Sequence, residues 1–511
     1  MRLPRRFPAA AVVLLAVVLA SCGTRAPDSA FLSAGQVAGQ QTTADGPGTV
    51  IDPVTGLPSS APDTPGSVTT TTGPGGTVPG QGGSTAGPGG GPGGPNPTSG
   101  PSAGPGQPNY ASDVGVTKDT IKIGQLFTRG GSFGPDAFTP ASYGVKAYFA
   151  DLNRRGGING RRVVLAECDD KGSGSANVEC ARKLADQEKV FALVGTIAYD
   201  YDGASYLNGK GVPDVAGQPI GTHYDTYPHL FNMYGSPYPR DGKTVGWKNK
   251  LYGGSEAYRS YRLKYGIKKA AVVYYGIEAS QRYGQAIADF LRTNEKLEVM
   301  VCEINFALPN YDRCVLDMKA NGVTAVWDAI DGNGNANLCK AMEDNGYIPQ
   351  VKASTIQTFT AEAGELFSES PECLNHVFVD HKSRPYFETG TASVKAFRDA
   401  MKRYFPGRES KMAQWTFEGW IGAHWFTEAA TRCGAALTRR CLEAFFDTKK
   451  YTAGGMMVPR DFRKVNFDVE KNYSDCVGIS RWQGGVRGGW VQVVDQDTNC
   501  LTTPYRAYSP T

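Results

Sequence analysis

The sequence predicts an α/β fold with two doubly wound parallel-sheet lobes and a cleft between them. From residue 121 onward, short apolar runs typical of strands alternate with segments whose apolar residues recur at helical spacing. Such a long alternation favours parallel sheets covered by helices on both faces. About 400 residues follow a low-complexity N-terminal segment, and this length is enough for two lobes.

The alternation can be followed along the chain. Tyr143, Ala147 and Ala150 repeat at helical spacing, and Gly156-Gly157 ends that helix. In a later predicted helix, Phe417, Ile421 and Trp425 share one stripe, which we interpret as core. The predicted strands are 121–127, 162–167, 190–195, 270–275, 298–305, 324–328, 476–479 and 490–494, and the predicted helices are 143–154, 177–188, 283–294, 311–321, 336–345 and 414–432.

The N-terminus has the features of an export signal. Arg2, Arg5 and Arg6 precede an apolar run at 9–20, which is too short to cross a bilayer as a helix. The run ends in Leu-Ala-Ser-Cys at 19–22, which resembles the lipobox of bacterial lipoproteins. The resemblance implies that residues 1–21 are removed and that Cys22 is lipidated, which places the chain on the extracytoplasmic face of the membrane. The alternative is an ordinary secretory signal with a coincidental cysteine.

Residues 22–112 are rich in Gly, Pro, Ser and Thr and contain too little apolar surface to offset the entropy of ordering. We therefore predict a disordered tether with a reach on the order of 50 Å, or a mucin-like stalk of the same length. The folded domain is expected at 113–511. The chain carries 53 basic and 49 acidic residues, a balance that gives no sign of nucleic-acid binding.

The cysteines predict disulfides. Without Cys22, ten of the eleven remain, an even number in a chain that carries an export signal. Zinc or another bound metal is not expected, because no C-x-x-C occurs and histidines number only five. Spacing does not fix the connectivity, but it suggests local pairs: Cys168 with Cys180, Cys302 with Cys314, Cys339 with Cys373, Cys433 with Cys441, and Cys476 with Cys500.

Several motifs resemble those of type I periplasmic solute-binding proteins. Residues 115–124 (GVTKDTIKIG) look like the opening strand of that family, and residues 151–161 (DLNRRGGINGR) resemble its helix-to-strand turn. Asp169-Asp170 after the next strand and Tyr283-Gly284 near a helix start also match. The nearest group is the branched-chain amino acid, amide and urea binders of ABC transporters, over about residues 115–462.

The resemblance implies a receptor for a small polar solute, amino acid-like or an amide, which delivers it to an ABC permease in the membrane. It implies no catalysis and no cofactor. Lobe 1 is expected at about 113–236 and 377–460, and lobe 2 at about 237–376 and 461–511. The residues expected to bind the solute are Ser132, Phe133, Thr196, Ala198, Tyr199, Gln218, Tyr238, Tyr283, Asp331 and Gln357.

The chain also departs from the family pattern. Where amino-acid binders have a small residue with Thr, and later an acid, this chain has 217–220 (GQPI) and 354–357 (STIQ). Asp331 is the remaining candidate for binding an ammonium group, but it could equally cap the helix that begins near Ala336. Two alternatives to a transport receptor stay open: a sensor that signals to a membrane partner, and an extracellular hydrolase. For the hydrolase, no nucleophile or pair of carboxylates could be assigned to the cleft.

Overall fold

The computed structural model describes residues 107–130, 137–236, 238, 240–243, 251–448, 451–463 and 469–508. Every described residue belongs to one unit of the chain, Pro97–Thr511. The signal peptide, Cys22, the tether up to residue 106, and Ser132 and Phe133 lie outside the described residues.

The first sheet is fully parallel, with strand order β2-β1-β3-β4-β5. Its strands alternate with helices, as the apolar pattern predicts. The sequence analysis did not identify β4, β5 or the short helices near them. The elements are β1 (Thr120–Phe127), α2 (Pro140–Arg154), β2 (Arg162–Asp169), α3 (Gly174–Arg182), β3 (Ala192–Val194), α4 (Ala204–Gly209), β4 (Asp214–Gly217), α5 (His223–Thr226) and β5 (Leu230–Asn232).

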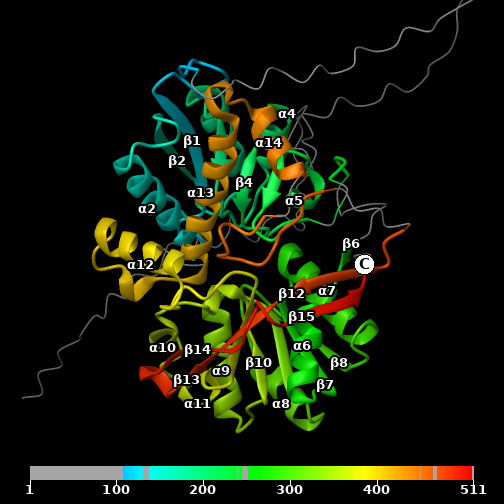
Figure 1. The fold of residues 1–511 in the computed structure, drawn as a ribbon. Coiled ribbons are helices and arrows are strands. Elements are labelled where there is room, and N and C mark those ends of the chain that lie inside the picture. Colours follow the sequence, from blue (N-terminus) through cyan, green and yellow to red (C-terminus); the bar gives the residue numbers. More distant parts are fainter. Residues whose placement is uncertain are drawn as a thin grey trace, which may run out of the picture. The chain divides into compact units, whose positions relative to one another are not determined.

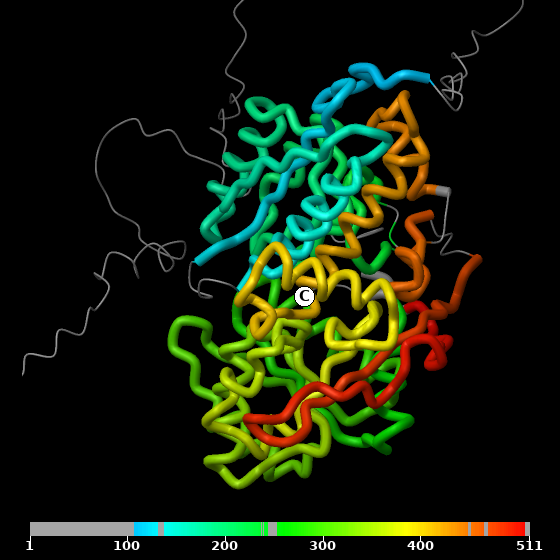
Figure 2. Tube along the Cα trace, turned by 60° about the vertical axis from the view of Figure 1, so that its left-hand side comes forward, coloured from blue at the N-terminus to red at the C-terminus, as the bar shows by residue number. Residues whose placement is uncertain are grey.

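Three helices from much later in the chain complete this lobe, α12 (Ala392–Tyr404), α13 (Gln414–Cys433) and α14 (Arg439–Thr448). Helix α13 runs beside α2, and both views show this late segment against the early strands (Figures 1 and 2). The two helices approach very closely, since a Cβ at Gly144 would lie 1.8 Å from the Thr416 carbonyl and one at Gly419 would lie 2.0 Å from the Ala141 carbonyl. The predicted stripe Phe417, Ile421 and Trp425 is completely buried, which confirms its core assignment.

The second sheet has seven strands in the order β14-β13-β11-β10-β9-β7-β8. Strands β7 to β11 are parallel, while β13 and β14 join antiparallel at one edge. The elements are β6 (Leu251–Gly253), α6 (Glu256–Tyr265), β7 (Lys269–Tyr275), α7 (Glu278–Thr293), β8 (Glu298–Ile304), α8 (Asp312–Ala320), β9 (Ala325–Ala329), α9 (Gly332–Asp344), β10 (Val351–Ala353), α10 (Ala363–Leu366), α11 (Pro371–Leu374), β11 (Val377–His381), β13 (Gly478–Gln483) and β14 (Gly489–Val494). Two small antiparallel pairs, β12 (Asn472–Cys476) with β15 (Cys500–Pro504) and β6 with β16 (Arg506–Tyr508), lie outside the large sheets.

The chain crosses between the two lobes three times: after β5, after β11, and between α14 and β12. The second crossing falls after His381, whereas we expected lobe 1 to resume at about 377. The difference arises because β11 pairs with β10 and β13 and therefore belongs to the second sheet. These crossings place residues distant in sequence next to one another.

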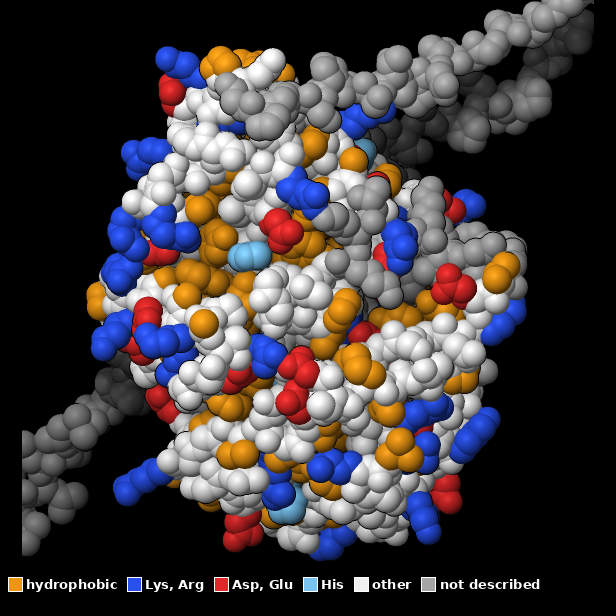
Figure 3. All heavy atoms as spheres, viewed as in Figure 1, with side chains coloured by type: hydrophobic (Ala, Val, Ile, Leu, Met, Phe, Trp, Pro, Cys, Tyr) orange, Lys and Arg blue, Asp and Glu red, His pale blue; other side chains and the backbone are white. Residues whose placement is uncertain are grey.

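All five cysteine pairs suggested by the spacing form disulfides. In the chain-entropy model, each closed loop contributes about 2–4 kcal/mol. No helix within the described ranges is long and apolar enough to cross a membrane. On the face drawn in Figure 3, basic and acidic side chains are interspersed, in keeping with the near balance of charge.

Candidate functional site

A cavity of about 520 Å³ lies between the two sheets, with walls from both lobes and from the crossing segments. Most wall residues sit just beyond the carboxyl ends of parallel strands. Residues 218–220 follow β4, Ala329, Ile330 and Asp331 stand at the end of β9, and residues 354–357 follow β10. Ligands of open α/β sheets bind at this end of the strands, so the position is that of a binding site.

Six of the ten residues expected to bind the solute line this cavity: Tyr199, Gln218, Tyr238, Tyr283, Asp331 and Gln357. Thr196 and Ala198 do not. Ala198 is buried in the hydrophobic cluster of lobe 1 with Leu126 and Tyr201. Thr196 is also buried, and its side chain lies against the buried carboxylate of Asp214. The loop after β3 therefore turns these two side chains into the lobe.

Aromatic rings form much of the wall. Tyr283 exposes 54% of its surface, which makes it the most open of these rings. Burial raises the pKa of Tyr199 to about 12, so its hydroxyl stays neutral. The hydroxyl of Tyr275 donates a hydrogen bond of 2.6 Å to Asp331, and that of Tyr234 donates one of 2.8 Å to Glu418. The rings give the cavity a large apolar surface with few free donors.

Asp331 acts as the N-cap of α9. Its carboxylate accepts a hydrogen bond from the Gly334 amide at 3.2 Å, in addition to the one from Tyr275. Helix α9 begins at Gly332, four residues earlier than the expected start near Ala336. The structure thus shows the capping role, while the side chain also borders the cavity.

A cluster of charges that no sequence motif predicted lies at the crossings, and we call it the crossover cluster: Glu256, Lys382, Arg460, Tyr473 and Asp475. Lys382 Nζ lies 2.5 Å from Glu256 and 2.9 Å from Asp475. Arg460 binds Asp475 with two nitrogens, one of them at 2.9 Å, and the Tyr473 hydroxyl donates to the same carboxylate at 2.9 Å. Although burial opposes it, these cations hold the pKa of Asp475 well below its usual value.

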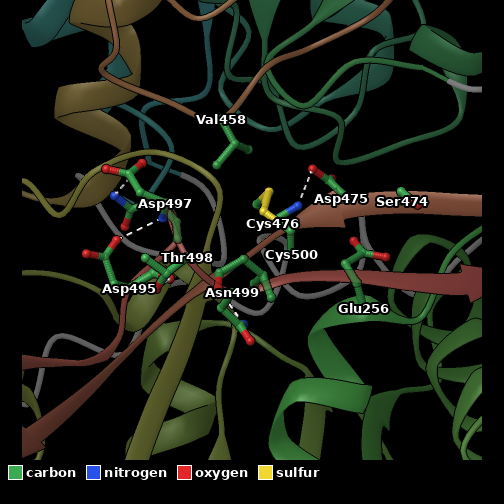
Figure 4. The surroundings of a disulfide bond; sticks show 12 residues. Glu256, Val458, Ser474, Asp475, Cys476, Asp495, Asp497, Thr498, Asn499 and Cys500 are labelled. Atoms are coloured by element: carbon green, nitrogen blue, oxygen red, sulfur yellow. Dashed lines mark hydrogen bonds between the residues drawn. A yellow bond between two sulfur atoms is a disulfide. The ribbon is translucent and has the colours of Figure 1, made fainter.

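The crossover cluster joins segments from all three crossings. Glu256 begins α6 after the first, Lys382 follows β11 at the second, and Arg460 and Asp475 flank the third. Figure 4 shows Glu256 on α6 and Asp475 on β12, next to the Cys476–Cys500 disulfide. A buried network at this place fixes the geometry of the connections between the lobes.

A second buried carboxylate, Glu418 on α13, lies behind the lobe 1 wall. It accepts hydrogen bonds from Gln218 at 2.9 Å, Tyr234 at 2.8 Å and Ser383 at 2.9 Å. Burial raises the pKa of Glu418 to about 7, against the effect of these three donors. Two of the three, Gln218 and Tyr234, line the cavity, so Glu418 orients part of its wall.

Asp380 at the end of β11 is the other acid that the sequence analysis missed, and it lines the cavity directly. Burial raises its pKa to about 6, and the nearby charge of Lys382 limits the rise. Had residues 377–381 been recognised as a strand, the position of Asp380 at its carboxyl end would have marked it as a site residue. The run has only three apolar residues before Asp380 and His381, which is too short a pattern to predict a strand.

A smaller cavity of about 380 Å³ shares Asp331, Ile356, Gln357 and Trp415 with the first. Across the described ranges, no group of three or more His, Cys, Asp or Glu is arranged to hold a metal ion. The walls of the larger cavity offer aromatic rings, carboxylates and side-chain amides.

Comparison with known proteins places these features in context. A family model described as periplasmic binding protein matches residues 120–485. An amino acid binding protein of Pseudomonas aeruginosa is 28% identical over 208 residues, covering 38% of this chain and 49% of the relative. The match thus spans about half the length of this curated relative.

Solved structures share the fold. A fatty acid ABC transporter substrate-binding protein from Thermomonospora curvata superposes with a TM-score of 0.58 at 15% identity, covering 78% of this chain and 95% of that one. A branched-chain amino acid transporter substrate-binding protein from Streptococcus pneumoniae, solved with isoleucine, gives a TM-score of 0.56 at 16% identity, covering 73% and 100%. The two-lobed α/β fold is confirmed, and the proteins that match it are named as binding proteins, not enzymes.

Proposed function

We propose a function from one premise: this chain belongs to the periplasmic binding protein family. It is an extracytoplasmic receptor that holds a small solute in the cavity between its lobes and delivers it to an ABC-type permease. The names of similar proteins include an amino acid binder and a fatty acid binder. Those names do not select one solute for this chain.

One observation carries the proposal: both lobes and the crossing segments contribute walls to a single cavity. A solute there would touch both lobes at once, so it would bind the closed arrangement better than an open one. Differential affinity of that kind drives closure, and few-residue connections serve as hinges. The closed form then offers a permease a surface that the empty form lacks.

Capture of a solute can be tested by thermal unfolding of the purified full-length chain against amino acids, amides, amines, sugars and fatty acids. A ligand that binds only the native state raises the unfolding midpoint by mass action. We expect a shift with one chemical class, and Tyr283→Ala should reduce that shift because Tyr283 is the most open ring of the cavity. Absence of any shift across all the classes would contradict a receptor role.

Attachment of the protein to the membrane also requires a test. The Leu-Ala-Ser-Cys motif at 19–22 supports lipid attachment at Cys22, and the length of 22–112 would let the domain reach a permease. We expect the wild-type chain in the membrane fraction and Cys22→Ala in the soluble extracytoplasmic fraction. Equal partitioning of both forms would contradict the anchor and leave the binding role intact.

A further inference from the structure

We propose that the solute is an organic cation without a carboxylate: an ammonium or guanidinium group on an apolar or aromatic body. This inference rests on the proposed function and names the class of solute that the same cavity would take. It departs from the zwitterionic amino acids that the resemblance suggests.

The formal charge of the wall is the first argument. Among the described lining residues, four carboxylates face two cations, Lys382 and Arg460. Both cations belong to the crossover cluster, where Glu256 and Asp475 balance them. No described cation of the wall compensates the negative charges of Asp331 and Asp380, so the cavity favours a positively charged ligand.

The unpartnered polar atoms are the second argument. Gln218 is 3% exposed and Glu256 is 8% exposed, and both line the cavity. Gln218 Oε1 and Glu256 Oε2 are buried and accept no hydrogen bond. A buried acceptor without a donor is costly unless a ligand supplies one. Trp415 Nε1 is a buried donor on the same wall, and it can hydrogen-bond a neutral oxygen of a solute as readily as a carboxylate.

A ligand carboxylate would find few donors here. In the two lobe 1 loops that border the cavity, the backbone amides already have acceptors: those of Tyr199, Gln218 and Ile220 donate to Thr128 Oγ1, the Thr196 carbonyl and the Gln218 carbonyl. Arg460 likewise donates to Asp475 and to two carbonyls. Within the described part of the wall, Asp331 and Asp380 would repel a ligand carboxylate, and the donor Trp415 Nε1 would offset only part of that repulsion.

The surroundings of Asp380 are the fourth argument, because they suit an ammonium group. Asp380 and Tyr283 line the same cavity, and the pKa of Tyr283 is raised first by burial and second by the charge of Asp380, which places this carboxylate near the most open ring. No described side chain hydrogen-bonds the Asp380 carboxylate. An ammonium beside Asp380 would gain an ion pair and contact with the ring face, as in aromatic cages for cations.

The test compares ligands that differ only by a carboxylate, using isothermal titration of the purified full-length chain. The pairs are agmatine and arginine, cadaverine and lysine, and phenethylamine and phenylalanine. We expect at least one amine to bind about tenfold or more tightly than its carboxylated partner, because the added carboxylate is repelled by Asp331 and Asp380. Tighter binding of the carboxylated member in every pair would overturn the inference.

Asp380→Asn should weaken binding of that amine by about tenfold or more. Asp317→Asn makes the same charge change on the exposed face of α8 and should leave it unaltered. Binding of amino acids, sugars or fatty acids without any binding of amines would overturn the cation inference while the receptor role stands. No binding by any class would overturn both, and an amine whose affinity ignores Asp380→Asn would also overturn the assignment.

Discussion

Asp475 and Asp380 line the same cavity, but their surroundings are opposite. Asp475 receives hydrogen bonds from Lys382, Arg460 and Tyr473, and its pKa lies well below the usual range. Asp380 has Lys382 nearby without a hydrogen bond from any described side chain, and burial raises its pKa to about 6. Folding therefore favours the charge at Asp475 and opposes it at Asp380.

This difference assigns a structural role to Asp475 and a ligand-binding role to Asp380, although both line the same cavity. The partners of Asp475 hold the crossings between the lobes, so its charge contributes to stability. An acid buried without a partner lowers stability, and such groups gather at functional sites because their partner arrives with the ligand. Replacing each acid by its amide tests this distinction, since shape is nearly conserved and charge is lost.

The largest effect is expected for Asp475→Asn. The change leaves Lys382 and Arg460 buried with too little counter-charge, which typically costs about 3–5 kcal/mol. Urea unfolding at pH 7 should show this loss as a lower midpoint with an unchanged slope. As a control, Asp344→Asn breaks an exposed pair with Lys340 and should cost less than about 1 kcal/mol.

The pH dependence of this effect has a definite sign. Because the folded pKa of Asp475 is lowered, its contribution is present above the unfolded pKa of about 3.9 and is lost as pH falls below that value. The gap between wild type and Asp475→Asn should narrow in acid. A gap that stays constant down to pH 3 would contradict a role for the charge.

The second effect has the opposite direction. For Asp380, the native state binds more protons than the unfolded state between about pH 4 and pH 6, so ionisation destabilises the fold as pH rises. Asp380→Asn should therefore raise the stability of the ligand-free protein at pH 7, by up to about 3 kcal/mol. The gain should vanish near pH 4, and a loss of stability at pH 7 would show that Asp380 has a structural partner.

Binding of a cation should follow the same titration. Asp380 faces Lys382 just after its own strand, Glu256, Tyr258 and Tyr261 on α6, and Tyr283 on α7. With its pKa at about 6, amine affinity should be constant above pH 7 and fall about tenfold per pH unit below 6. Titrations at several pH values should show this slope in wild type and no such slope in Asp380→Asn.

The sequence predicted the sheets, helices and disulfides better than it predicted the residues of the candidate site. The parallel sheets, their main helices and the five disulfides followed from apolar periodicity and cysteine spacing, which are local signals. Strand β10 (Val351–Ala353) was not predicted, because the charged Lys352 is its central residue. In the fold, Lys352 Nζ lies 2.5 Å from the buried carboxylate of Asp328, which balances its charge. A polar residue in a three-residue strand hides the pattern that periodicity relies on.

The candidate site was predicted where family motifs mark strand ends and missed where the chain crosses between lobes. Tyr283 stands in such a motif, Tyr199 and Gln218 were expected from the resemblance as a whole, and all three line the cavity. Glu256, Lys382 and Asp475 come together from positions more than 90 residues apart, through contacts that only the folded chain creates. No spacing rule on one sequence can pair residues so distant.

The smallest effect on stability is expected for Asp331, which has hydrogen-bond partners as Asp475 does but borders the cavity as Asp380 does. Its carboxylate caps α9 and accepts from Tyr275, so Asp331→Ala should cost about 1 kcal/mol, whereas Asp331→Asn keeps a good capping side chain and should stay within about 0.5 kcal/mol. Because both donors are satisfied without a ligand, Asp331→Asn should weaken amine binding less than Asp380→Asn does. Urea unfolding and amine titration of the three variants provide the comparison. If Asp331→Asn gave the greater loss of affinity, the ammonium would lie at the helix cap instead of beside the acid of β11.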